Sequence, residues 1–256
     1  MNRLRLRTSL LPPLIAFTVI GGLWEAVVKG FGIRELVLPA PSAIGGAVWD
    51  NRSGWLHDAW VTGQEAFLGF LIALAVALTL AVAATFSRPV ERALLPVITV
   101  MQLIPVVALG PALVIGLGFG LTPRIVVAAL ITFAPLTINA IVGFQAVDRD
   151  ALEVLRSVNA SQREIFVKLR LPHALPYLAA ATRICIGLSL IGAMIAEWQG
   201  SSEGLGYTFA RSQRALATER MWASVFVLAL MGVVGTVAVG VVERRLLRWQ
   251  PTRLRN

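Results

Sequence analysis

Long apolar runs separated by short polar stretches are the dominant pattern along this chain. A helix that crosses a hydrocarbon core of about 30 Å needs about 20 mostly apolar residues, and six runs approach or exceed that length. We therefore predict an all-α, polytopic membrane helix bundle with six transmembrane helices. The predicted spans cover residues 10–28, 66–86, 97–121, 125–147, 177–196 and 221–242.

Several of these runs are irregular. Arg183 interrupts the fifth, so we extend that span backward and expect the guanidinium to snorkel or to be buried against protein. A five-span alternative would put the polar segment 150–172 and the C-terminus on opposite sides. Pro105 and Pro111 lie in the third run and Pro135 in the fourth, and each removes a backbone donor. We expect a broken or bent segment there, although membrane helices tolerate proline in general.

The longest outer segment, residues 29–63, is broken by Pro39 and Pro41. Ser42 then fits the N-cap of a short helix on the membrane surface. Trp is enriched at the depth of the lipid headgroups. We therefore interpret the three tryptophans of this segment as interfacial anchors rather than as a ligand cage. They are Trp49, Trp55 and Trp60.

The distribution of Lys and Arg predicts the orientation, because cytoplasmic loops retain an excess of them. With the N-terminus inside, fifteen of these residues fall on inner segments and seven on outer ones. We expect both termini in the cytoplasm of a bacterium and a multi-pass protein of the plasma (inner) membrane. The run 10–28 is long enough to be a retained anchor, with a cleaved signal peptide as the alternative.

Composition supports the membrane class. The chain is 57% hydrophobic and 14% charged, with a mean hydropathy of +0.75, values outside the range of soluble domains. The net charge of +9 divides among the loops, so we expect a lipid membrane and no nucleic acid as partner. Cys185 is the single cysteine, so no disulfide framework is expected. His57 and His173 fall in predicted loop or interface positions and form no cluster of metal-ligating residues, so no metal site is expected.

The segment 150–172, DALEVLRSVNASQREIFVKLRLP, is a polar, helix-forming island between apolar runs. Asp150 precedes Glu153 by three positions, and Ser161 precedes Glu164 by three, which are capping-box spacings. They predict two short helices, 151–158 and 162–171, joined by a turn at residues 159 and 160. Pro172 should end the second helix and push the residue before it out of the helical region.

This island resembles the EAA loop of bacterial ABC importer permeases. Glu153 takes the Glu position, Asn159 the Gly position, and Leu169, Leu171 and Pro172 close the motif. Two alanines of the pattern are replaced, by Val154 and Leu155. Asn tolerates a left-handed backbone better than most residues, so we expect Asn159 to form the same turn that Gly forms in the family pattern. The alternative interpretation is an ordinary solvated helix-turn-helix loop.

Further segments are similar to the nitrate, sulfonate and taurine branch of these permeases. They include Leu-Pro-Ala-Pro-Ser at 38–42, Ala-Leu-Gly-Pro at 108–111 with Gly-Phe-Gly at 118–120, the run 144–148, and Ser-Glu-Gly-Leu-Gly-Tyr at 202–207. Trp198 and Gln199 depart from the branch. The resemblance implies the type I ABC importer permease fold with cytoplasmic coupling helices, in one transmembrane permease domain that covers residues 1–256.

The resemblance also implies an assembly of two ATPase subunits, a second permease copy in a homodimer, and an extracytoplasmic solute-binding protein. The loop 148–172 would dock on an ATPase, and that ATPase would bind ATP and Mg. This chain contains no phosphate-binding G-x-x-x-x-G-K-[ST] motif, so we expect no catalytic group and no cofactor in it. The expected docking residues are Glu153, Arg156, Ser157, Val158, Asn159, Ala160, Ser161 and Arg163.

Polar residues in or next to apolar runs are candidates for the solute path. They are Gln102, Asn139, Gln145 and Glu197. The first two could instead bond helices together, and the last two lie near span ends where water is available. The expected cargo is a sulfonate-, taurine- or nitrate-like anion or a heterocycle such as a pyrimidine vitamin precursor. The uncharged middles of most spans disfavour a strongly anionic solute held by direct ion pairing.

Two other classes of function compete with an ATP-driven importer. An ion-coupled secondary transporter would normally carry a charged residue in the middle of a span, and here Arg183 comes nearest to that position. An intramembrane enzyme would need a motif such as H-E-x-x-H or G-x-S-x-G, and the sequence contains neither.

Overall fold

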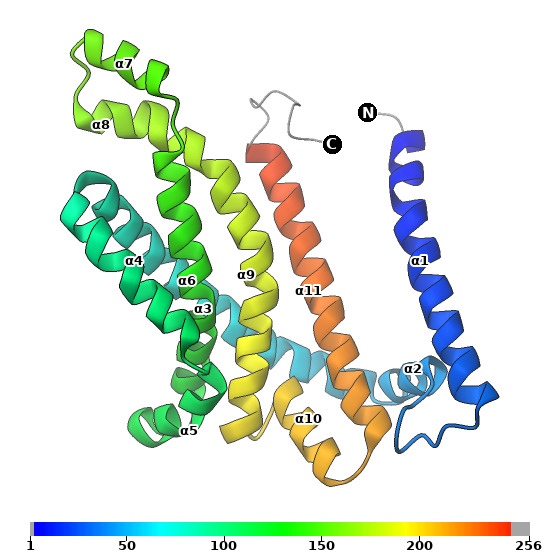
Figure 1. Ribbon diagram of the computed structural model, residues 1–256. Helices are drawn as coiled ribbons and strands as arrows, with labels where there is room; N and C mark the ends of the chain where they lie inside the picture. The colour runs from blue at the N-terminus through cyan, green and yellow to red at the C-terminus, as the bar shows by residue number, and fades with distance from the viewer. Residues whose placement is uncertain (1–2, 247–256) are drawn as a thin grey trace.

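The structure is a computed structural model that describes residues 3–246, with the side chains of residues 3–10, 13, 14 and 246 left out of the description. Every regular element in this part of the chain is a helix (Figure 1). The elements are α1 Arg3–Gly30, α2 Pro41–Asp50, α3 Arg52–Phe86, α4 Arg88–Leu103, α5 Val106–Leu117, α6 Leu121–Gln145, α7 Arg149–Ser157, α8 Gln162–Ile165, the π-helix η1 Phe166–Arg170, α9 Leu171–Gly200, α10 Leu205–Arg214 and α11 Thr218–Leu246.

Four stretches of the described residues are long and apolar enough to cross a membrane: Arg52–Phe86, Leu121–Gln145, Gln162–Gly200 and Thr218–Arg245. The pair α4 and α5 makes a fifth if it is counted as one span. The first predicted span falls within α1, part of which lies outside the described side chains. The predicted class, an all-helical polytopic membrane bundle, is confirmed. The beginning of α1, the end of α11 and the α7–α8 hairpin all lie at one end of the bundle (Figure 1).

The third predicted span is broken into two helices, which is one of the two forms expected there. α4 ends at Leu103, and α5 runs at 94° to it. Pro105 explains the break, because it forces Ile104 out of the helical region, to φ −74° and ψ 122°. Pro111 and Pro135, by contrast, lie inside unbroken helices. α6 begins at Leu121, four residues earlier than predicted, so Arg124 belongs to a helix and not to an outer loop.

The core of the bundle is the contact of α3, α6 and α9, and small residues let these helices approach closely. Ala128 of α6 faces a glycine on each side. A Cβ atom on Gly69 of α3 would lie 2.6 Å from the Cβ of Ala128, and one on Gly192 of α9 would lie 2.8 Å from its Cα. At this level the three helices are packed backbone against backbone.

The outer segment corrects two expectations. The N-cap of α2 is Ala40, and Ser42 is not the cap. Instead Ser42 donates its N–H and its hydroxyl to the Glu25 carboxylate of α1, at 3.0 and 2.6 Å, so α1 satisfies the start of α2. Trp55 is buried and donates Nε1–H to the Ala47 carbonyl at 2.9 Å, whereas Trp49 and Trp60 are exposed as anchors require.

Arg183, the charge within the fifth span, has a partner. Its guanidinium forms an ion pair with Glu243 of α11. This agrees with the expectation that Arg183 packs against protein. The pair joins α9 to α11 and removes an unpaired charge from the bundle.

Candidate functional site

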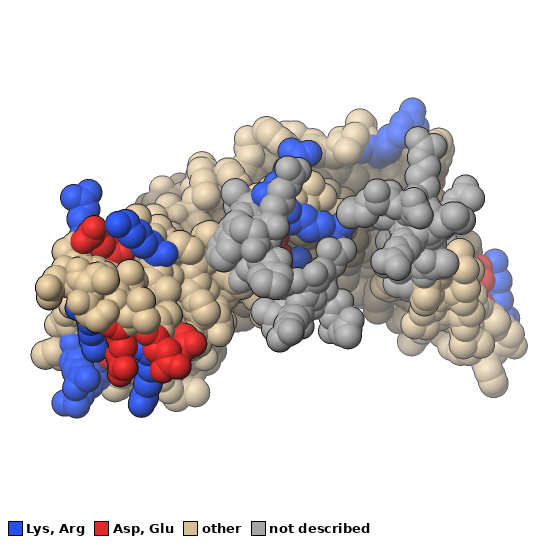
Figure 2. All heavy atoms as spheres, turned by 90° about the horizontal axis from the view of Figure 1, so that it is seen from above, with Lys and Arg blue, Asp and Glu red and all other residues tan. Residues whose placement is uncertain are grey.

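The α7–α8 hairpin projects from the end of the bundle that also holds the beginning of α1 (Figure 1). Seen from that end, Figure 2 shows both signs of charge gathered on the lobe where α7 and α8 lie. Seven of the eight predicted docking residues are exposed, and Ala160 is half-buried. Within the described part of the chain, Glu153, Arg156 and Arg163 form no ion pair, so their charges are free for a partner.

The turn between the two short helices has the predicted left-handed residue. Asn159 has φ 55°. Its N–H donates to the Arg156 carbonyl and the Ala160 N–H donates to the Leu155 carbonyl, both at 3.0 Å. This pair of hydrogen bonds is a Schellman motif with Asn in place of Gly. Val158, which precedes it, is 69% exposed and gives the tip of the hairpin an apolar contact surface.

The caps of the hairpin were predicted in part. The capping box of Ser161 and Glu164 is confirmed: Glu164 N–H donates to Ser161 Oγ at 3.3 Å, and Ser161 N–H donates to the Glu164 carboxylate at 3.0 Å. The cap of α7 is Asp148, two residues before the predicted Asp150. Its carboxylate accepts the Asp150 N–H at 3.0 Å.

The predicted end of the second helix at Pro172 is wrong. Leu171 has helical angles, φ −64° and ψ −49°, and the chain continues as one helix from Gln162 to Gly200. The turn before the proline is a π-helix, in which the Leu171 N–H bonds to the Phe166 carbonyl five residues back. A π turn shifts the hydrogen-bond register by one residue, so the missing N–H of Pro172 interrupts the helix less than in a regular α-helix.

The base of the hairpin is fixed to the bundle by two apolar residues that the sequence analysis missed. Ile165 is buried, and the Phe166 ring lies 5.4 Å from the ring of Phe86 and 5.2 Å from that of Phe144. Arg170 adds a hydrogen bond from Nη1 to the Phe144 carbonyl at 3.3 Å. Phe166 therefore joins the hairpin to the ends of α3 and α6. In the sequence, Ile165 and Phe166 stand out as two adjacent apolar residues within the polar segment, and this could have indicated a buried attachment point.

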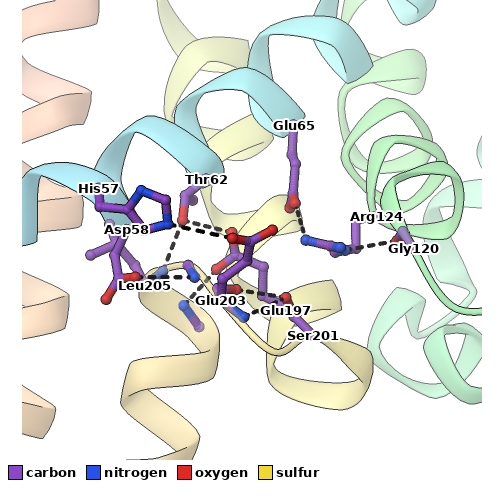
Figure 3. A network of polar contacts seen from close by, with 12 residues as sticks. His57, Asp58, Thr62, Glu65, Gly120, Arg124, Glu197, Ser201, Glu203 and Leu205 are labelled. Carbon is purple, nitrogen blue, oxygen red and sulfur yellow. Dashed lines mark hydrogen bonds and ion pairs between the residues drawn. The ribbon is translucent and has the colours of Figure 1, made fainter. Parts of the chain in front are cut away.

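Glu197 lies at the other end of the same continuous helix, in a network of buried polar groups (Figure 3). Thr62 Oγ–H and Gly206 N–H each donate to its carboxylate at 2.6 Å. Leu205 N–H donates to Thr62 Oγ at 2.9 Å. Glu197 and Thr62 thus satisfy the first N–H groups of α10.

The glycines of the Ser-Glu-Gly-Leu-Gly-Tyr segment are required by this contact. Gly204 has φ 99°, and a Cβ atom there would lie 2.3 Å from the Glu197 carboxylate. At Gly206 a Cβ atom would lie 2.0 Å from the Met194 carbonyl oxygen. Larger residues would therefore separate α10 from the end of α9.

Two charged residues of this network, Glu65 and Arg124, were not predicted. Both are buried, and they form an ion pair that links α3 to α6 (Figure 3). Arg124 also donates Nε–H to the Gly120 carbonyl at 2.8 Å. In the sequence each flanks an apolar run, one with a negative and one with a positive charge. That complementarity was the only signal of their pairing.

The other proposed path residues are dispersed. Gln102 is exposed on α4, and Gln145 is exposed at the end of α6 nearest the hairpin. Asn139 is half-buried and donates to the Pro135 carbonyl of its own helix at 2.8 Å. The end of α9, which carries Glu197, and the end of α6, where Gln145 lies, are at opposite ends of the bundle (Figure 1). The structure therefore does not bring these four residues into one cluster, and their role in a path stays a prediction.

Gln199, one of the two departures from the family pattern, holds α5 in place. Its Nε2–H donates to the Val107 carbonyl at 2.8 Å. A Cβ atom on Gly110 would lie 1.9 Å from Gln199 Oε1, so this glycine is what allows the close approach. The bent segment after Pro105 is thereby attached to the end of α9.

A polar cavity of about 560 Å³ lies beside this network, between α3, α10 and the beginning of α11. On its wall Asp58 accepts hydrogen bonds from Thr208 Oγ at 2.6 Å and from Gly204 N–H at 3.3 Å. His57 lies 3.4 Å from Glu203. Arg211 and Arg220 also line it. The described residues contain no group of three or more His, Cys, Asp or Glu side chains that could hold a metal ion.

Comparison with known proteins gives consistent matches over most of the chain. The family described as "Binding-protein-dependent transport system inner membrane component" matches residues 59–248. The formylaminopyrimidine transport permease protein ThiX of Halalkalibacterium halodurans is 30% identical over 94% of this chain and 96% of its own length. The riboflavin transport system permease protein RibX of Chloroflexus aurantiacus is 33% identical over 89% of this chain and 85% of its own length. The putative aliphatic sulfonates transport permease protein SsuC of Bacillus subtilis is 30% identical over 96% of this chain and 90% of its own length.

Solved structures share the fold at lower identity. A chain of an amino acid ABC transporter superposes with a TM-score of 0.64 at 17% identity, over 77% of this chain and 96% of that chain. A chain of the inward-facing MetNI methionine ABC transporter superposes with a TM-score of 0.58 at 20% identity, over 78% of this chain and 98% of that chain. These similarities confirm the fold predicted from the sequence.

The aromatic contact at the base of the hairpin gives a first testable prediction. Phe166→Ala should remove the packing against Phe86 and Phe144 and lower the free energy of unfolding by about 2 kcal/mol. The hairpin should also become more accessible, measured as faster hydrogen exchange of residues 150–165 in detergent. Val167→Ala, on the exposed side of the same turn, is the matched control and should change neither quantity. Equal exchange rates in both variants would contradict the assignment of Phe166 as the attachment point.

Proposed function

The chain belongs to the family of inner membrane components of binding-protein-dependent transport systems, and from this membership we propose how its two polar ends work together. It is a membrane-spanning permease subunit of an ABC importer. That family membership sets aside the ion-coupled carrier as an alternative. The proposals below concern the partners, the orientation, the path of force and the solute.

The observation that carries the proposal is the exposed hairpin on a continuous helix. We infer that residues 153–163 dock on a separate ATPase subunit, with the apolar tip at Val158 and the free charges of Glu153, Arg156 and Arg163 as contacts. Two ATPases would close around ATP and Mg and move the two hairpins of a permease homodimer. Because Phe166 packs against α3 and α6, the movement would reach the bundle and not be lost in a flexible loop.

The far end of the same helix explains how docking could open the opposite side. Glu197 holds the start of α10, and Gln199 holds α5. A rotation of Gln162–Gly200 as one body would therefore move both elements. This corresponds to a rigid-body exchange between inward- and outward-open states, in which ATP favours one state and hydrolysis restores the other.

The orientation in this proposal follows the excess of Lys and Arg on the hairpin side. Both termini and the hairpin would face the cytoplasm of a bacterium. The polar cavity beside α10 would face the exterior, where an extracytoplasmic binding protein delivers solute. The cavity residues Asp58, Glu203, Arg211 and Arg220 offer both signs of charge for that contact.

For the solute we propose a small, uncharged heterocycle. Two arginines of the described spans have ion-pair partners: Arg183 pairs with Glu243, and Arg124 pairs with Glu65. No free cation is therefore available in the middle of the described spans to hold a sulfonate. Two of the relatives named above are permeases for a formylaminopyrimidine and for riboflavin, and their names support the heterocycle class.

Docking can be tested by reversing charge and adding bulk at the hairpin. The double variant Glu153→Lys with Ser161→Arg should insert normally but lose the ATPase on co-purification and lose uptake, because the contact surface and the capping box are both altered. Glu203→Lys, an exposed change at the opposite end, is the control and should keep the ATPase bound. Normal uptake by the double variant would remove the hairpin from the mechanism.

The solute class can be tested in vesicles that contain the permease with its ATPase and binding protein. We expect ATP-dependent accumulation of a labelled aminopyrimidine, with taurine unable to compete at equal concentration. Accumulation of taurine in place of the pyrimidine would show that an anion is carried and would contradict the argument from paired charges.

A further inference from the structure

The polar network at the end of α9 contains charges that do not balance. Two carboxyl groups, Glu65 and Glu197, are buried with exposed fractions of 0% and 1%. One guanidinium, Arg124, is buried beside them with an exposed fraction of 8%. If all three groups were ionised, one negative charge would remain in a site that is shielded from solvent. An uncompensated buried charge is strongly unfavourable.

The hydrogen bonds differ between the two carboxyl groups. The Glu197 carboxylate accepts two hydrogen bonds, one on each oxygen, from Thr62 and Gly206. Glu65 accepts at Oε1 from Arg124, while its Oε2 is buried and has no hydrogen-bond donor. Thr62 and Glu65 lie three residues apart on one face of α3, so the Glu197 carboxyl group bonded to Thr62 lies beside that of Glu65. Two ionised carboxylates in contact would repel each other, whereas a carboxylic acid and a carboxylate form a strong hydrogen bond.

We propose that Glu65 keeps a proton at neutral pH and donates it to Glu197, so that the pair is a buried protonation site. The proton occupies the Oε2 atom that otherwise lacks a partner. Glu197 remains the single anion of the site and receives hydrogen bonds from Glu65, Thr62 and Gly206. Arg124 supplies the compensating positive charge and bonds to the carbonyl oxygen of the Glu65 carboxylic acid. Every polar atom of the two side chains then has a partner and the net charge is zero.

The groups that bond to this pair come from three elements. α3 supplies Thr62 and α6 supplies Arg124, while α10 supplies the Gly206 N–H. The other titratable groups nearby lie on the cavity side. Asp58 accepts hydrogen bonds from Thr208 and Gly204. His57 lies next to Glu203, and the side chains of His57 and Glu203 are largely exposed. These groups have partners of their own on the cavity side, and none of them bonds to Glu65 or Glu197.

The site connects the elements that the proposed transport cycle must move. Through Glu65, Arg124 and Glu197 it ties α3, α6 and α9 together, and through Gly206 it ties them to α10. Loss of the proton would leave two repelling carboxylates at this junction. The role in transport rests on the proposed function, whereas the shared proton rests only on the geometry of this chain.

Infrared spectroscopy of the purified permease tests the proton directly. A buried carboxylic acid gives a C=O stretching band separate from that of carboxylates, and the band shifts in deuterated water. We expect this band at neutral pH in the unmodified protein and in Glu203→Gln, an exposed control, and its loss in Glu65→Gln.

Glu65→Gln should fold with an unchanged thermal midpoint. The amide reproduces the protonated acid, because its oxygen accepts from Arg124 and its NH2 donates to Glu197. Glu65→Leu should lower the midpoint, since Arg124 and Glu197 would then lose these bonds. Absence of the band from the unmodified protein, its persistence in Glu65→Gln, or failure of Glu65→Gln to fold would each overturn the proposal. Because neither measurement requires ATPase or solute, they remain decisive even if the proposed transport cycle is wrong.

Discussion

The continuity of the helix from Gln162 to Gly200 is the constraint on which the rest of this structure depends. A proline near its beginning would be expected to divide it into a loop helix and a membrane helix. The π turn at 166–170 prevents that division by shifting the hydrogen-bond register ahead of Pro172. As a result the exposed hairpin and the buried polar network are two ends of one rigid element, separated by the thickness of the bundle.

The close packing around this helix means that its movement would displace the neighbouring helices. Gly69 and Gly192 bring α3, α6 and α9 into backbone contact around Ala128, and such contacts leave little freedom for independent sliding. At the hairpin end Phe166 packs against two aromatic rings. At the opposite end Glu197 and Gln199 hold α10 and α5. A partner that rotates the hairpin therefore acts on the whole bundle.

The sequence was sufficient where the structure is determined locally. The positions of most apolar runs, the left-handed turn at Asn159 and the capping box at Ser161 depend on residues within a few positions of one another, and all were predicted. The π turn was not, and the aromatic contacts of Phe166 within it involve Phe86 and Phe144, which are distant in sequence. The pairing of Glu65 with Arg124 was also missed: each residue immediately precedes a predicted span, and only the contact of α3 with α6 brings them together.

Interruption of the helix tests the account most directly. Two glycines inserted after Val167 would leave the hairpin tip and the polar network around Glu197 unchanged but would add a flexible joint between them. In vesicles that contain the ATPase and binding protein, uptake per ATP hydrolysed should then fall to background while the ATPase still co-purifies. Uptake that remains coupled to hydrolysis in this variant would show that force does not pass along the helix, and the central claim would be wrong.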